Sequence, residues 1–259
     1  AGMKSQWTPN CLRANTIVSL NLIQLPVHLT TRTGTVAVSE KLGCVLTDSP
    51  TDSKTLPMNA LILVDLQNDF TPSGALPVPE GDSIVPLINQ LQQKFDLVVA
   101  TQDWHPSDHQ SFAVQHEGRQ PGELIDLHGI PQVLWPIHCV QETEGAQFIS
   151  NLDQGRVKRV FRKGQNPRID SYSGFFDNDH QSSTGMGEYL REQGVDEVFV
   201  VGLATDYCVR FTAADAAELG FRTIVISDAT RGVNLMTGDV DRAFVALQEQ
   251  GVRILLSSE

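Results

Sequence analysis

The chain has 259 residues and a formal net charge of −12 at pH 7, which argues against a surface for nucleic acid or anionic membranes. Its hydrophobic fraction of 41% and charged fraction of 19% are typical of a globular protein with a full core. No apolar run approaches the roughly 18 residues of a membrane span. A basic region followed by an apolar core is also missing at the start, so we predict no cleavable signal.

The cysteines lie at positions 11, 44, 139 and 208, and they form neither a C-x-x-C pair nor a disulfide-dense pattern. Free thiols in a chain of this length favour a reducing compartment, so we expect a cytoplasmic protein.

Residues 1–57 differ in character from the rest of the chain. They are rich in serine and threonine and show no helical periodicity, whereas a clean apolar strand begins directly after Met58. The opening Ala1-Gly2-Met3 resembles a vector scar. We therefore expect Met58 to be the natural start and residues 1–57 to be a non-native or upstream extension, largely disordered. A small additional domain is the alternative.

From Met58 onward, apolar strands alternate with amphipathic helices. This alternation predicts an α/β fold with a mainly parallel sheet covered on both faces. A long stretch with weak periodicity, residues 101–142, is too long for an idle connector and is predicted to be functional. We predict strands at 59–65, 97–100, 156–162, 196–201, 222–227 and 252–256, and helices at 82–95, 183–193, 206–219 and 239–250.

Reactive side chains follow four of the predicted strands. Asp65, Asp103 with His105, Lys163 and Cys208 each come at or just after the end of a strand. Because the carboxyl ends of parallel strands meet at one edge of a sheet, we expect these side chains to share a site.

Cys208 is a candidate nucleophile, because it lies where a strand turns into a helix. Backbone N–H groups and the helix dipole lower a thiol pKa there and can hold an oxyanion. Asp65 could accept the thiol proton, and Lys163 would keep Asp65 ionised and favour thiolate. The alternatives are a buried structural cysteine, a loop-capping aspartate and a solvated surface lysine.

The segment Asp103-Trp104-His105 places a carboxylate and an imidazole on one side of an extended chain, and His109 and His138 follow it. Such a set suits one divalent ion, Zn or Fe with Mn as a further option, although a surface histidine near an aspartate is also common. Phe70, Trp104, Trp135 and Tyr172 are either core aromatics or walls of a pocket for a flat ring.

Six ordered motifs resemble those of the nicotinamidases (pyrazinamidases) of the isochorismatase-like cysteine hydrolase superfamily, whose fold is a three-layer α/β/α sandwich. The resemblance extends from about Met58 to Glu259. The motifs are residues 63–70 (LVDLQNDF), 101–105 (TQDWH), 135–140 (WPIHCV), 161–164 (FRKG), 170–175 (DSYSGF) and 202–209 (GLATDYCV).

The resemblance implies a role for each of these residues. It implies a catalytic triad of Asp65, Lys163 and Cys208, and an oxyanion hole formed by the N–H groups of Ala204 and Cys208, after a cis peptide between Leu203 and Ala204. It also implies that Phe70 and Trp135 sandwich the substrate ring, with Tyr172 as a further neighbour. The implied metal ligands are Asp103, His105 and His138, and His109 stands where some members place a fourth ligand.

The implied activity is hydrolysis of nicotinamide to nicotinate and ammonia through a cysteine thioester, a step of NAD salvage, with pyrazinamide as a second substrate. The alternatives are a related small-amide or carbamoyl hydrolase, a non-catalytic binding protein on the same fold, and a thiol redox protein. We expect no nucleic-acid or membrane partner. The sequence does not decide between a monomer and a homo-oligomer.

Overall fold

The computed structural model of the chain describes residues 58–259. The prediction of an N-terminal extension over residues 1–57 lies outside this range. Within it, no helix combines the length and the apolar character that crossing a bilayer requires.

The core of the described part is a six-stranded sheet in which every neighbouring pair is parallel. Its strand order is β5-β2-β1-β6-β7-β8. Apolar and β-branched side chains make β1, β2 and β6 near-continuous buried runs, as expected for strands covered on both faces. The strands are β1 (Met58–Val64), β2 (Leu97–Asp103), β5 (Val157–Lys163), β6 (Val195–Leu203), β7 (Arg222–Arg231) and β8 (Arg253–Leu255).

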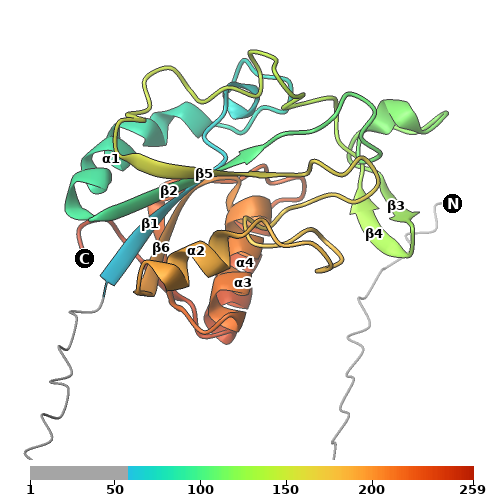
Figure 1. Cartoon of the computed structure of the whole chain (residues 1–259). Helices are drawn as coiled ribbons and strands as arrows, with labels where there is room; N and C mark the ends of the chain where they lie inside the picture. Colours follow the sequence, from blue (N-terminus) through green and yellow to red (C-terminus); the bar gives the residue numbers. More distant parts are fainter. Residues whose placement is uncertain (1–57) are drawn as a thin grey trace, which may run out of the picture. The chain divides into compact units, whose positions relative to one another are not determined.

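Helices cover both faces of the sheet, and the predicted three-layer α/β/α fold is confirmed. Figure 1 shows α1 (Val85–Leu91) on one side and α2 (Met186–Glu192), α3 (Arg210–Glu218) and α4 (Asp239–Glu249) on the other. Two apolar clusters correspond to these layers. Ile88 of α1 belongs to the first, and Leu190, Ala213 and Leu247 of the other three helices belong to the second.

Several predicted boundaries were wrong. The predicted helix at 82–95 consists of α1 between two short 3-10 turns, Gly81–Ile84 and Gln92–Lys94, and no side chain caps its start. The stretch 101–142 contains a hairpin of β3 (Leu124–Leu127) and β4 (Ile130–Val133). Four-residue strands are too short to produce a clear alternation, which is why the periodicity missed them.

The chain order creates a crevice at the carboxyl edge of the sheet. From β1 the chain adds β2 and β5 on one side, and then β6 pairs with β1 on the other side. Ligands bind at such a reversal of strand order in open α/β sheets. Asp65 follows β1 and Cys208 follows β6, so these two residues flank the reversal.

Gly202 is the residue of β6 that pairs with Val64. It adopts φ +116°, and a Cβ there would lie 2.1 Å from the Val64 carbonyl oxygen. A side chain at this position would therefore push apart the two strands that carry Asp65 and Cys208.

We expect Gly202→Ala to lower the free energy of unfolding by about 1–3 kcal/mol, because the added methyl group meets backbone that cannot move away. Denaturant unfolding followed by circular dichroism measures this change. Gly155→Ala is the control, since its Cβ would meet only the end of the Asp153 side chain. Equal stability of the two variants would contradict the packing argument.

Candidate active site and metal centre

Lys163 is the buried centre of the site. Its Nζ lies 2.9 Å from Asp65 Oδ2, 2.5 Å from Asp103 Oδ1 and 3.4 Å from Cys208 Sγ, and it also donates to the Ser171 carbonyl at 2.8 Å. The register of the sheet explains this meeting, because Asp103 and Lys163 are paired across β2 and β5. Burial opposes a charged lysine, but the two carboxylates raise the Lys163 pKa well above its usual value.

Asp65 is held from the neighbouring strand. Thr101 Oγ1 donates to Asp65 Oδ1 at 2.6 Å, and the Asp65 backbone N–H donates to the same hydroxyl at 3.2 Å. The second oxygen, Oδ2, forms an ion pair with Lys163 but receives no directed hydrogen bond. This oxygen is therefore the one with lone pairs free to accept a proton from the thiol.

The sequence-based prediction expected the strand-to-helix turn and Lys163 to lower the pKa of the Cys208 thiol, and the structure indicates the opposite direction. Burial raises the pKa of the Cys208 thiol well above its usual value, and Asp65 and Asp103 add to this effect against Lys163. Burial also raises the pKa of Asp65, although Lys163 opposes it. The resting thiol thus keeps its proton, and Asp65 is a better base than an exposed aspartate.

Asp103, His105 and His138 form a buried group whose potential ligand atoms all lie within 4.8 Å of one another. Asp103 Oδ2 is 3.6 Å from His105 Nε2 and 3.8 Å from His138 Nε2. His105 Nδ1 donates to the Gly164 carbonyl and His138 Nδ1 to the Pro136 carbonyl, so both Nε2 atoms present lone pairs toward Asp103. The donor set therefore fits a divalent metal ion.

Gly164 allows His105 to take this position. It adopts φ +64°, and a Cβ there would lie 2.3 Å from the His105 ring. The glycine that follows Lys163 therefore lets the imidazole lie directly against the backbone that accepts its hydrogen bond.

His109 is less well prepared as a ligand than the other two histidines. The backbone N–H of Ser111 donates to His109 Nδ1 at 3.2 Å, and the Ser111 hydroxyl lies 2.7 Å from the same nitrogen. With Nδ1 as the acceptor, the neutral ring carries its hydrogen on Nε2, which is buried without a hydrogen-bond partner. Ligation through Nε2 would need the other tautomer.

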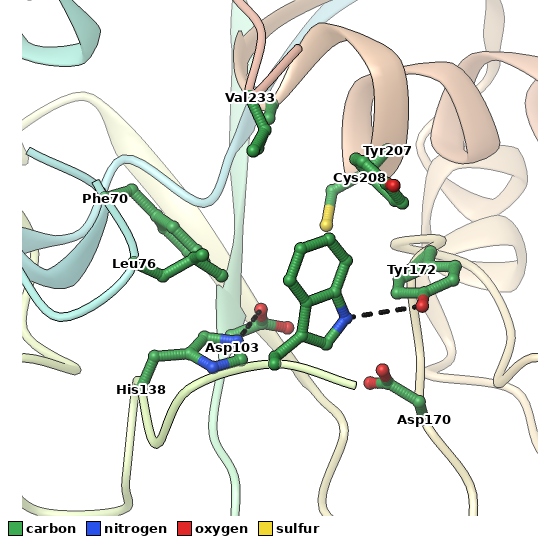
Figure 2. Close-up of a pocket in the computed structure, with 11 residues that line it drawn as sticks. Phe70, Leu76, Asp103, His138, Asp170, Tyr172, Tyr207, Cys208 and Val233 are labelled. Atoms are coloured by element: carbon green, nitrogen blue, oxygen red, sulfur yellow. Dashed lines mark hydrogen bonds and ion pairs between the residues drawn. The ribbon is translucent and has the colours of Figure 1, made fainter. Parts of the chain in front are cut away.

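A small pocket opens beside Cys208. Figure 2 shows Phe70 and Leu76 on one side of it and Tyr172 and Tyr207 on the other, with the Cys208 thiol pointing in between. Mostly apolar walls with a few polar groups suit a small flat ligand. The pocket is lined by Phe70, Leu76, Asp103, Trp135, His138, Asp170, Tyr172, Ala204, Tyr207, Cys208 and Val233.

The aromatic walls are fixed by polar contacts. Trp135 Nε1 and Gln132 Nε2 both donate to the Tyr172 hydroxyl, at 3.3 and 3.0 Å. Asp206, the chain neighbour of Tyr207, accepts the backbone N–H groups of Val233 and Asn234, at 2.9 and 2.7 Å. Asp206 thereby ties the loop that carries Val233 to the turn that carries Cys208.

The peptide between Leu203 and Ala204 is cis, as predicted, and Ala204 lines the pocket. Sequence reasoning missed Thr101, Leu76, Tyr207 and Val233, as well as the contact of Asp103 with Lys163. Thr101 and Tyr207 belong to motifs that had been singled out, and Leu76 and Val233 come from loops without any sequence signal.

Comparison with known proteins shows the family. The isochorismatase domain model matches residues 59–259. The nicotinamidase of Escherichia coli is 49% identical over 203 residues, which cover 77% of this chain and 95% of that protein.

Two solved structures place the fold in the same family. A nicotinamidase/pyrazinamidase of Acinetobacter baumannii has a TM-score of 0.76 at 48% identity, covering 79% of this chain and 99% of that one. A zinc complex of the pyrazinamidase of Pyrococcus horikoshii has a TM-score of 0.63 at 39% identity, covering 77% and 99%. The chain therefore belongs to the isochorismatase family and groups there with the nicotinamidases.

Proposed function

We propose that this protein is an amidohydrolase that converts nicotinamide to nicotinate and ammonia, and that it also accepts pyrazinamide. The observation that carries the proposal is the meeting of three side chains beside an aromatic pocket. The Cys208 thiol contacts Lys163, Lys163 pairs with Asp65, and ligand atoms of Asp65 and Cys208 lie within 4.8 Å of each other. Relatives named nicotinamidase, and one named nicotinamidase/pyrazinamidase at 40% identity, support the substrate.

The first half of the reaction forms a thioester. Asp65 takes the thiol proton while the Cys208 sulfur attacks the carboxamide carbon, and the N–H groups of Ala204 and Cys208 hold the oxyanion. When the tetrahedral adduct collapses, the carbon–nitrogen bond breaks and Asp65 returns the proton to the departing ammonia.

The second half releases the acid. Asp65 takes a proton from a water that attacks the thioester carbon, and the carbon–sulfur bond breaks. The Cys208 sulfur recovers a proton from Asp65, and the acid leaves as nicotinate after losing its remaining proton to solvent. Throughout the cycle, Lys163 supports the negative charge on Asp65.

A divalent ion would be held by Asp103, His105 and His138, with Zn or Fe favoured and Mn as a further option. When bound, it supplies a Lewis acid beside the pocket. Phe70 and Trp135 line the pocket that would take the pyridine ring, with Tyr172 as a further neighbour. His109 is a fourth candidate ligand. Free thiols at Cys139 and Cys208 suit a cytoplasmic location.

We expect the purified chain to release ammonia from nicotinamide, and Cys208→Ala to lower kcat by a factor of about 10⁴ or more, because the nucleophile is lost. A coupled ammonia assay measures both. Cys139→Ala is the matched control, since this buried cysteine lies outside the residues that line the pocket. Substantial activity of Cys208→Ala would show that the nucleophile is assigned wrongly.

We expect His105→Ala to bind zinc more than about 100-fold more weakly, because it removes a ligand rather than an outer-shell partner. Chelation should likewise abolish ammonia release, and added metal should restore it. Metal content by mass spectrometry of the purified proteins checks the first point. His116→Ala, which alters a histidine outside the ligand group, should keep its metal. Unchanged metal in His105→Ala would remove this residue from the ligand set.

A further inference from the structure

Asp170 is a buried carboxylate, 4% exposed, that the proposed reaction does not use. Its Oδ1 accepts the backbone N–H of Ser171 at 2.8 Å, and its Oδ2 accepts Gln132 Nε2 at 2.8 Å. Within residues 58–259, no lysine, arginine or histidine nitrogen lies within 4.0 Å of it. A buried charge without a partner is costly, so a cation near Asp170 would remove an unfavourable feature.

The surroundings of Asp170 indicate where that cation would lie. Asp170, His105 and His109 form a second buried group whose potential ligand atoms lie within 4.8 Å of one another. This group shares His105 with the group of Asp103 and His138. Because His105 Nδ1 is engaged by the Gly164 carbonyl, Nε2 is the nitrogen left to bind a metal ion. We infer from the shared histidine that one ion would lie beside both groups.

His109 provides the second, independent observation. Its Nε2 is buried without a hydrogen-bond partner, and it belongs to the same group as the Asp170 carboxylate. No direct hydrogen bond joins the two side chains in the described part of the chain. An unpartnered donor and an acceptor with free lone pairs can both be satisfied by water bound to an ion.

The sum of the charges in the buried site also favours a bound divalent ion. The carboxylates that contact Lys163 or belong to the two possible ligand groups are Asp65, Asp103 and Asp170, and Lys163 is the ammonium among them. Lys163 contacts Asp65 and Asp103 but not Asp170. Three carboxylates and one ammonium leave two negative charges, which one divalent ion neutralises.

We propose that Asp170 is a second carboxylate of the metal centre, and that its charge faces the bound divalent ion from the side of His109. The inference rests on the metal centre of the proposed function. It adds a residue that lies outside the group of Asp103, His105 and His138. With Asp65 and Lys163 included, the charges of the site and the ion then sum to zero.

Zinc titration of the metal-stripped full chain, in competition with a chromophoric chelator, tests the proposal. We expect Asp170→Asn to bind zinc about 10–100-fold more weakly, the usual effect of losing a group that supports a metal site. Asp177→Asn is the matched control, because it neutralises another buried aspartate, one that accepts the backbone N–H groups of Gln181 and Ser182. Its zinc affinity should not change.

Thermal unfolding separates a role in metal binding from a purely structural role. Without metal, Asp170→Asn should unfold at or above the temperature of the unsubstituted chain, because an unpaired buried charge is gone. With zinc, its gain in unfolding temperature should be smaller. Gln132→Met removes a hydrogen bond to Asp170 but leaves its charge, so it should keep the zinc affinity. Asp170→Ser replaces Asp170→Asn if that variant does not fold.

Unchanged zinc affinity in Asp170→Asn would overturn the proposal. A lower unfolding temperature in the absence of metal would then assign Asp170 a structural role. Equal losses of affinity in Gln132→Met and Asp170→Asn would overturn it as well, because the hydrogen bond rather than the charge would then matter. If the unsubstituted chain binds no divalent ion, the metal centre itself is wrong, an outcome distinct from a failure of Asp170 alone.

Discussion

A buried ammonium, Lys163 Nζ, stands between the carboxylates of Asp65 and Asp103, 2.9 and 2.5 Å away. Breaking a buried ion pair by removing one partner costs about 3–5 kcal/mol, because the remaining charges lose their compensation. Here one lysine contacts two carboxylates with different surroundings. Asp65 has a carboxylate oxygen within 4.8 Å of the Cys208 sulfur, and Asp103 belongs to the group whose donor atoms fit a metal ion. The two halves of the site are therefore joined through a single side chain, and a change in the charge of one half acts on the other.

The topology of the sheet makes this arrangement possible. Parallel pairing of β2 with β5 places Asp103 opposite Lys163, and the reversal of strand order between β1 and β6 opens the crevice beside Asp65. Small residues then permit close approach, as Gly202 does against Val64 and Gly164 against the His105 ring. Loops from distant parts of the chain complete the pocket, and Asp206 ties one of them to the turn that carries Cys208.

Much of this could be predicted from the sequence, because strand ends are easy to locate and parallel strands share one edge. Asp65, Lys163 and Cys208 meet as expected, and so do Asp103, His105 and His138. What could not be predicted depends on contacts across the fold. Periodicity carries no information about the ring tautomer of His109, which Ser111 determines, nor about the burial that keeps the Cys208 thiol protonated. Val233 and Leu76 reach the pocket from loops whose course follows from tertiary packing.

The central claim is that Cys208, with Asp65 as its proton acceptor, forms a covalent intermediate with the substrate. The most direct test is to quench the protein with acid during turnover of nicotinamide and to map the modified peptides by mass spectrometry. Our account predicts a nicotinoyl thioester on Cys208 and an unmodified Cys139. An adduct on Cys139, or full turnover without any adduct on Cys208 under conditions that preserve thioesters, would contradict it.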